Sequence, residues 1–128
     1  MDVARLKSIP LFASLSDEEV GQIAPFAEEI EVPAGERLVS EGEFSYQFYA
    51  IEEGTAEVTR GGEHITDLGP GQFFGEMGLL ERALRNATVV AKEPMRTITL
   101  TGWEMKRLEK ANPEAVEQIR QVIEERKT

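Results

Sequence analysis

The hydrophobic and polar positions divide the chain into a helical beginning, a long middle of short alternating runs and a helical end. Ser16 and Glu19 form a capping-box pattern, and apolar residues then recur at helical spacing until Pro25. Between residues 30 and 100, short β-favouring runs alternate with glycines and polar turns. The runs are Arg37–Ser40, Gln47–Ile51, Ala56–Thr59, His64–Leu68, Ala87–Ala91 and Thr97–Thr101. Short strands separated by turn signals predict an antiparallel sandwich or barrel.

Helical spacing returns after residue 102. Trp103, Met105 and Leu108 predict a short helix, and Asn112 and Pro113 then supply an N-cap and a first-turn proline. The apolar positions of the last helix form one stripe: Val116, Ile119, Val122 and Ile123. Two interpretations of this stripe stay open, because it either packs on the barrel or makes a functional contact.

The composition favours a single domain of 128 residues whose core needs neither disulfides nor a metal. Cysteine is absent, which excludes thiol chemistry and is typical of a reducing cytoplasm. No apolar run approaches the ~20 residues of a membrane-spanning helix, and the N-terminus lacks a signal-peptide pattern. We therefore expect a cytoplasmic protein that does not enter a membrane.

The charge distribution separates one segment from the rest of the chain. The net charge of −10 is unfavourable for binding a nucleic acid polymer, which requires clustered Lys and Arg. Residues 75–96, in contrast, contain four cations and three acids. A small anionic ligand would therefore bind in this segment.

Residues 74–89 read FGEMGLLERALRNATV, a pattern suited to binding a phosphorylated sugar. Gly75 precedes one expected helical turn, Met77–Leu80, whose free N–H groups can receive a phosphate. Arg85 can add a forked cation to the same anion, and Glu76 can accept a hydrogen bond from a ribose hydroxyl. The alternative for Arg85 is a simple ion pair with a nearby glutamate.

This stretch resembles the phosphate-binding cassette of cyclic nucleotide-binding domains. It matches the family pattern without a gap through Gly75, Glu76, Leu79, Arg85, Ala87, Thr88 and Val89. Further matches are IPLF at 9–12, AGE at 34–36, EGE at 41–43 and FYAI at 48–51, followed by Gly54. The resemblance implies one mainly-β domain over residues 1–128, an antiparallel eight-stranded jelly roll with flanking helices. Its expected parts are an N-terminal helical segment (1–28), the barrel (29–101) with the cassette (74–89), and C-terminal helices (102–128).

The resemblance also implies a set of ligand-binding residues and a function. The cassette residues are Gly75, Glu76, Met77, Gly78, Leu79, Arg85, Asn86 and Ala87, with Val58, Ile65 and Thr66 lining the sugar and base side. The implied function is a stand-alone sensor for cyclic AMP, with cyclic GMP as the second candidate. The last helix would cover the ligand pocket, or contact a protein partner or a second copy. Two alternatives remain: a scaffold whose site is unused, or a fragment of a larger transcription factor, transporter or enzyme.

Two departures from the family pattern concern the cassette. Asn86 stands where the family has Ala, Ser or Thr, which leaves the base preference open. The loop from Glu81 to Leu84 lacks the Gly or Pro common at its tip. We therefore expect the short helix to continue by another turn and to shift Arg85.

A catalytic or metal-binding role is not expected. His64, the one histidine, lies beside Gly61 and Gly62 in a hairpin and is expected to be solvated. A metal-binding jelly roll of the cupin type needs several histidines with a carboxylate. No nucleophile with a neighbouring base stands out either, so we expect a binding module and not an enzyme.

Overall fold

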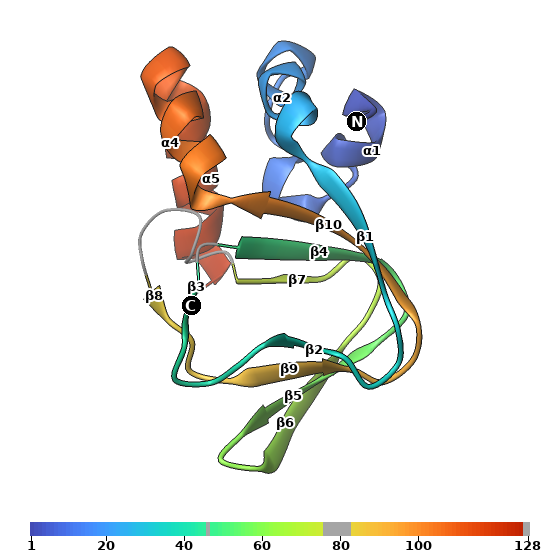
Figure 1. The fold of residues 1–128 in the computed structure, drawn as a ribbon. Coiled ribbons are helices and arrows are strands. Elements are labelled where there is room, and N and C mark those ends of the chain that lie inside the picture. Colours follow the sequence, from blue (N-terminus) through green and yellow to red (C-terminus); the bar gives the residue numbers. More distant parts are fainter. Residues whose placement is uncertain (46, 76–82, 127–128) are drawn as a thin grey trace.

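Two four-stranded antiparallel sheets face each other in the computed structural model, which describes residues 1–45, 47–75 and 83–126 (Figure 1). The first sheet has the order β1-β10-β4-β7, formed by Glu28–Val32, Met95–Thr101, Gln47–Glu53 and Phe73–Phe74. The second has the order β2-β9-β5-β6, formed by Arg37–Val39, Thr88–Ala91, Ala56–Arg60 and Glu63–Leu68. A short ribbon pairs β3 (Phe44–Ser45) with β8 (Ala83–Leu84). The predicted mainly-β antiparallel jelly roll is confirmed.

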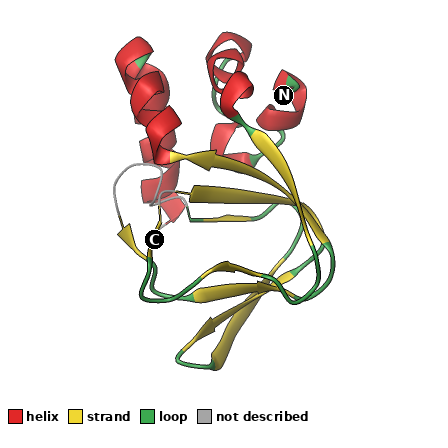
Figure 2. Ribbon diagram, viewed as in Figure 1, coloured by secondary structure: helices red, strands yellow, loops and turns green. Residues whose placement is uncertain are grey.

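Helices from both ends of the chain gather on the side of the first sheet that faces away from the second (Figure 2). They are α1 (Val3–Lys7), η1 (Pro10–Phe12), α2 (Asp17–Ile23), η2 (Ala24–Phe26), α4 (Gly102–Ala111) and α5 (Pro113–Arg126). The predicted capping box is present, since the Glu19 N–H donates to Ser16 Oγ over 3.1 Å and the Ser16 N–H donates to the Glu19 carboxylate. Asn112 caps α5 by accepting the Ala115 N–H. None of the described helices is long and apolar enough to cross a membrane.

Strand β4 contributes to two separate cores, because successive side chains on a strand point to opposite faces. Phe48 and Ala50 pack among the helices, whereas Tyr49 and Ile51 pack in the space between the two sheets. We call these the helical core and the barrel core. The fold is thus a three-layer arrangement in which the first sheet is covered on both faces.

The apolar stripe of α5 lies in the helical core. Val116, Ile119 and Ile123 are almost fully buried there, and Val122 packs at the margin. Leu11 and Phe12 of η1 belong to the same core. Of the two interpretations of the stripe, the structure therefore shows the packing one.

The expected continuation of the cassette helix to Leu84 is wrong. Ala83 and Leu84 form β8, whose partners in the ladder are Ser45 and Phe44. The ladder continues into the next residues, since the Arg85 N–H donates to the Glu43 carbonyl over 2.9 Å. These non-local backbone hydrogen bonds fix an extended conformation that helix propensity alone would not give.

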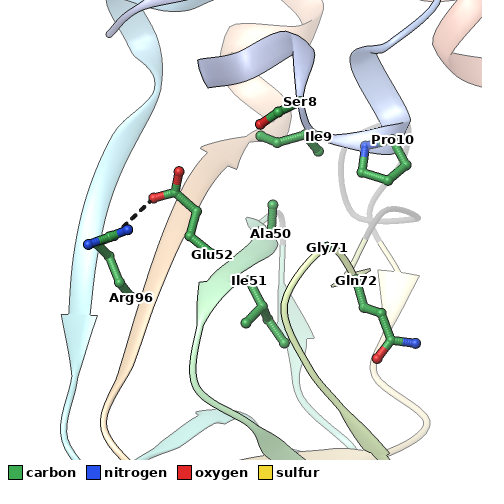
Figure 3. A pocket seen from close by; sticks show the side chains of 9 residues that line it. All are labelled: Ser8, Ile9, Pro10, Ala50, Ile51, Glu52, Gly71, Gln72 and Arg96. Carbon is green, nitrogen blue, oxygen red and sulfur yellow. Dashed lines mark hydrogen bonds and ion pairs between the residues drawn. The ribbon is translucent and has the colours of Figure 1, made fainter. Parts of the chain in front are cut away.

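An ion-pair network fastens α1 to the first sheet. Arg5 donates to the carboxylates of Glu52 on β4 and Glu29 on β1, with 2.7 Å between Arg5 Nε and Glu52 Oε2. Arg96 on β10 also contacts Glu52, with 3.3 Å between Arg96 Nε and Glu52 Oε1 (Figure 3). The hydrogen bond from Arg5 holds the pKa of the Glu52 carboxyl below its ordinary value.

Glu52→Gln should lower the free energy of unfolding by about 1–2 kcal/mol at pH 7, because it removes a charged acceptor from a half-buried network. The folded-state pKa of Glu52 is depressed, so its contribution is present above the unfolded value and is lost as the pH falls. The difference between wild type and variant in urea unfolding should therefore shrink as the pH falls below about 4.5.

Glu53→Gln is the matched control, since Glu53 is largely exposed and contacts only Arg96 among the ion pairs of the described residues. Equal losses for the two variants, or a Glu52→Gln loss that does not change with pH, would contradict the role of Glu52 in the ion-pair network.

Candidate functional site

Arg85 is the centre of the candidate site and is only 9% exposed. It follows β8, and its Nη2 donates to the backbone carbonyl of Gln47 at the start of β4. Gly75, directly after β7, passes against both groups. A Cβ at this glycine would lie 2.6 Å from the Gln47 carbonyl oxygen and 3.0 Å from Arg85 Nη1. The predicted glycine and the predicted arginine therefore meet at one point.

Gly75 is required at this point for two reasons. Its φ of +79° lies in the left-handed region of the backbone, which residues other than glycine rarely adopt. The space for a side chain is also occupied by the carbonyl and the guanidinium. The absence of a side chain at Gly75 thus allows Arg85 to lie against the backbone of β4.

Tyr49 and Gln47 also belong to the site, although neither is among the ligand-binding residues predicted from the sequence. The Tyr49 ring stacks on Phe74 with 5.1 Å between centroids, and its hydroxyl donates to Gln47 Oε1 over 2.8 Å. Burial raises the pKa of the Tyr49 hydroxyl, and the nearby charge of Arg85 opposes that rise. The alternation of side chains between the two faces of β4 could have identified Tyr49, because Phe48 and Ala50 on either side of it point into the helical core.

The remaining described candidates lie on neighbouring segments. Asn86 is exposed, Ala87 is half-buried, and both connect Arg85 to β9. Val58 and Thr66 are paired across β5 and β6, and Val58 packs at the edge of the barrel core. Ile65 is 49% exposed and lies where the register of this pair shifts. The structure thus places Val58 toward the barrel core and leaves Ile65 and Thr66 open to solvent.

Four predicted ligand-binding residues lie outside the described residues: Glu76, Met77, Gly78 and Leu79. The expected helical turn Met77–Leu80 falls in the same segment. Their roles stay predictions.

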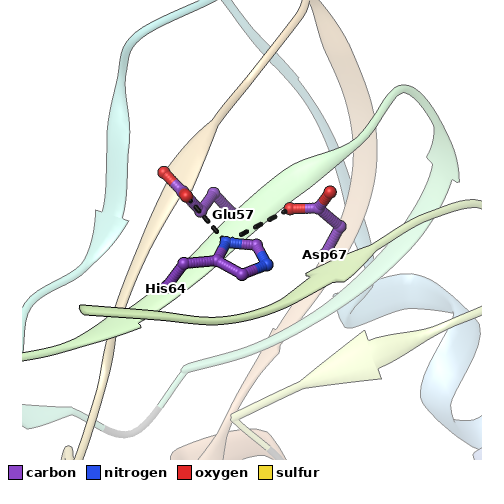
Figure 4. A group of neighbouring side chains, drawn as sticks. All are labelled: Glu57, His64 and Asp67. Atoms are coloured by element: carbon purple, nitrogen blue, oxygen red, sulfur yellow. Dashed lines mark hydrogen bonds and ion pairs between the residues drawn. The ribbon is translucent and has the colours of Figure 1, made fainter.

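His64 is half-exposed, as expected, but its ring contacts a carboxylate (Figure 4). Its Nδ1 lies 2.8 Å from Glu57 Oε2 and 3.9 Å from Asp67 Oδ1. One histidine with two carboxylates is a donor set that can hold a cation. Lys92 already lies 2.9 Å from Asp67, however, and supplies a positive charge within the chain. We therefore interpret Glu57, His64, Asp67 and Lys92 as a chain of ion pairs on the surface.

A hollow of about 240 Å³ lies beside the ion pair of Glu52 and Arg96 (Figure 3). It is lined by Ser8–Pro10, by Ala50–Glu52 of β4, by Gly71 and Gln72, and by Arg96. Neither Arg85 nor any other predicted ligand-binding residue that the structure describes lines this hollow.

The sequence matches the family model described as "Cyclic nucleotide-binding domain" over residues 29–112. It is 35% identical over 95 residues to a cAMP-dependent protein kinase regulatory subunit of Schizosaccharomyces pombe, covering 73% of this chain and 23% of that protein. A regulatory subunit of the same name from Eremothecium gossypii is 38% identical over 96 residues, covering 74% of this chain and 21% of that protein. The chain thus spans less than a quarter of the length of these curated relatives.

Solved structures share the fold. The catabolite activator protein of Thermus thermophilus superposes with a TM-score of 0.77 at 28% identity, covering 91% of this chain and 57% of that one. The regulatory domain of Toxoplasma gondii PKA, solved with cAMP, superposes with a TM-score of 0.79 at 24% identity, covering 96% and 48%. The second likeness concerns the fold alone.

Gly75→Ala should lower the free energy of unfolding by about 2–4 kcal/mol. Alanine is strained in the left-handed backbone conformation, and its methyl group would clash with the Gln47 carbonyl and with Arg85. Gly71→Ala is the matched control, because Gly71 has a φ of +86° but open space around it. The control should lose only the backbone contribution of about 1–2 kcal/mol. Urea unfolding measures both, and equal losses would show that Gly75 does not limit the approach of Arg85.

Proposed function

This chain belongs to the family of cyclic nucleotide-binding domains, and we propose that it is a regulatory module that binds cyclic AMP at Arg85. The observation that carries the proposal is the meeting of the buried Arg85 guanidinium with Gly75 and the Gln47 carbonyl. A guanidinium in a partly desolvated site binds a phosphate through short, charge-assisted hydrogen bonds. The names of the relatives, regulatory subunits of cAMP-dependent protein kinase, support cyclic AMP as the ligand.

In the proposed complex, the cyclic phosphate contacts Arg85, and Glu76 accepts a hydrogen bond from the ribose hydroxyl. The other cassette residues, Met77, Gly78 and Leu79, surround the phosphate and sugar. Val58, Ile65 and Thr66 line the sugar and base side. Arg85 is only 9% exposed, and a low local dielectric strengthens the attraction of its guanidinium to an anion. Asn86, which brings no hydroxyl after Arg85, favours cyclic AMP over cyclic GMP.

Strand β7 offers a physical link between the site and the C-terminal helices. Phe74 stacks on Tyr49 in the barrel core, whereas Phe73 belongs to the helical core. There Phe73 lies 5.4 Å from the ring of Phe48, which in turn lies 5.8 Å from that of Phe12. A movement of Gly75 toward a bound phosphate would therefore change the packing under α5.

The burial of α5 limits how far this helix can move when a nucleotide binds. Each of Val116, Ile119 and Ile123 contributes roughly 1.5–3 kcal/mol by its burial. Complete release of the helix would therefore cost more than the few kcal/mol of differential affinity that a ligand usually supplies. We infer that nucleotide binding shifts the population of α5 positions and so alters its contact with a protein partner or a second copy.

Arg85→Ala should weaken the binding of cyclic AMP by about 30-fold or more, because a charge-assisted contact in a partly desolvated site is lost. Isothermal titration calorimetry with cyclic AMP and with cyclic GMP measures this. Arg37→Ala is the control, because it makes the same charge change at an exposed position on β2.

Circular dichroism must stay native for both variants. An Arg85→Ala affinity within a few-fold of wild type would overturn the role of Arg85. No saturable heat from the wild-type protein with either nucleotide would favour the scaffold with an unused site.

Saturating cyclic AMP should slow amide hydrogen exchange in two places, around residues 75–87 and along α5. The reason is that β7 joins the site to the core in which α5 packs. Arg85→Ala is the control, in which added nucleotide should change neither region. Protection confined to residues 75–87 would mean that α5 only packs and that the output lies elsewhere.

A further inference from the structure

Glu41 lies beside the segment that carries Arg85, although an acid near an anion-binding site repels the ligand. Its carboxylate accepts the N–H of Gly61 at 3.0 Å, in the turn between β5 and β6. Its own N–H donates to Thr88 Oγ1 over 3.0 Å, at the start of β9. One exposed glutamate thus joins the loop before β3, the hairpin turn and the first residue of β9.

The backbone of Arg85 is held by the two residues that follow Glu41. The Gly42 N–H donates to the Arg85 carbonyl over 2.8 Å, and the Arg85 N–H donates to the Glu43 carbonyl over 2.9 Å. From the hairpin side, Arg60 Nε donates to the carbonyl of Asn86 over 2.9 Å. Residues 85–88 are therefore anchored from two directions, and both anchors reach the β5–β6 hairpin, one at the Gly61 turn and one at the end of β5.

We propose that Glu41 and Arg60 are positioning residues for Arg85, tying the β5–β6 hairpin turn to residues 85–88 so that the guanidinium stays where the anion binds. The inference rests on the proposed function. Neither side chain needs to touch the nucleotide. Removing the Glu41 side chain unties residues 41–43 from the hairpin turn, and removing Arg60 releases the Asn86 carbonyl. The main-chain hydrogen bonds to Arg85 remain but are less firmly held, and Arg85 then spends less time in its binding position.

The sign of the charge separates positioning from simple electrostatics. By charge alone, removal of Glu41 would strengthen the binding of an anion, because a repelling carboxylate disappears. As a positioning residue, Glu41 should instead weaken binding when it is removed. Arg60 cannot make this distinction by loss of charge, because both mechanisms predict weaker binding.

The test compares Glu41→Ala with Glu43→Ala by calorimetry with cyclic AMP. Both remove one negative charge from the same loop, but the described part of the structure gives the Glu43 side chain no hydrogen bond or ion pair. Glu41→Ala should weaken binding by about three- to tenfold, the worth of the one hydrogen bond that the side chain accepts from Gly61. Glu43→Ala should bind equally or slightly more tightly. Arg60→Gln should resemble Glu41→Ala, and Arg60→Lys, which keeps a donor, should retain most of the affinity.

A second measurement uses the ligand-free protein. Amide exchange at Arg85 and Gly61 should be faster in Glu41→Ala than in wild type and unchanged in Glu43→Ala, because only the first variant loses the tie. If wild type binds neither nucleotide, the proposed function fails, and this exchange measurement still decides whether Glu41 holds Arg85. Unchanged exchange at Arg85 in Glu41→Ala, or binding by that variant as tight as by Glu43→Ala, would overturn the inference.

Discussion

Successive side chains of β4 point into two different cores, and the positions of both the helices and the site follow from this. Phe48 and Ala50 give the helices an apolar surface to cover, while Tyr49 and Ile51 fill the space between the sheets. The backbone of the same strand supplies the Gln47 carbonyl that Arg85 contacts. A shift of β4 by one residue would exchange its two faces. The apolar surface for the helices, the side chains between the sheets and the carbonyl that Arg85 contacts would then no longer coincide.

The parts of the fold that the sequence predicted are those in which local pattern and tertiary contact agree. Strands β4, β5 and β10 carry β-favouring side chains, and the Ser16–Glu19 capping box is a local signature that the structure contains. Strand β1 was not predicted, because its sequence EEIEV contains three glutamates and only Val32 is fully buried. The two-residue strands β3, β7 and β8 exist only through pairing with distant segments, which no local pattern records.

The same reasoning explains which site residues the sequence revealed. Gly75 and Arg85 belong to one ordered motif, so their spacing along the chain was informative. Tyr49, Gln47 and Glu41 reach the site through strand register and loop contacts, from positions more than thirty residues before Arg85. The helix expected up to Leu84 failed for a related reason, because the ladder between β3 and β8 outweighs local helix propensity.

One acceptor of the Arg85 guanidinium among the described residues is a main-chain oxygen, that of Gln47. This has a consequence for selectivity and for evolution. A substitution of Gln47 leaves its main-chain carbonyl in place unless the path of the backbone changes. This contact with Arg85 is therefore insensitive to sequence drift at position 47. A ligand that draws the guanidinium away must offer more than a neutral carbonyl does. A charged phosphate oxygen forms a hydrogen bond roughly twice as strong as a neutral acceptor, whereas an uncharged nucleoside gains nothing by the exchange. If Arg85 binds the phosphate as we propose, the carbonyl competes with the ligand for the guanidinium and so disfavours molecules that lack the phosphate.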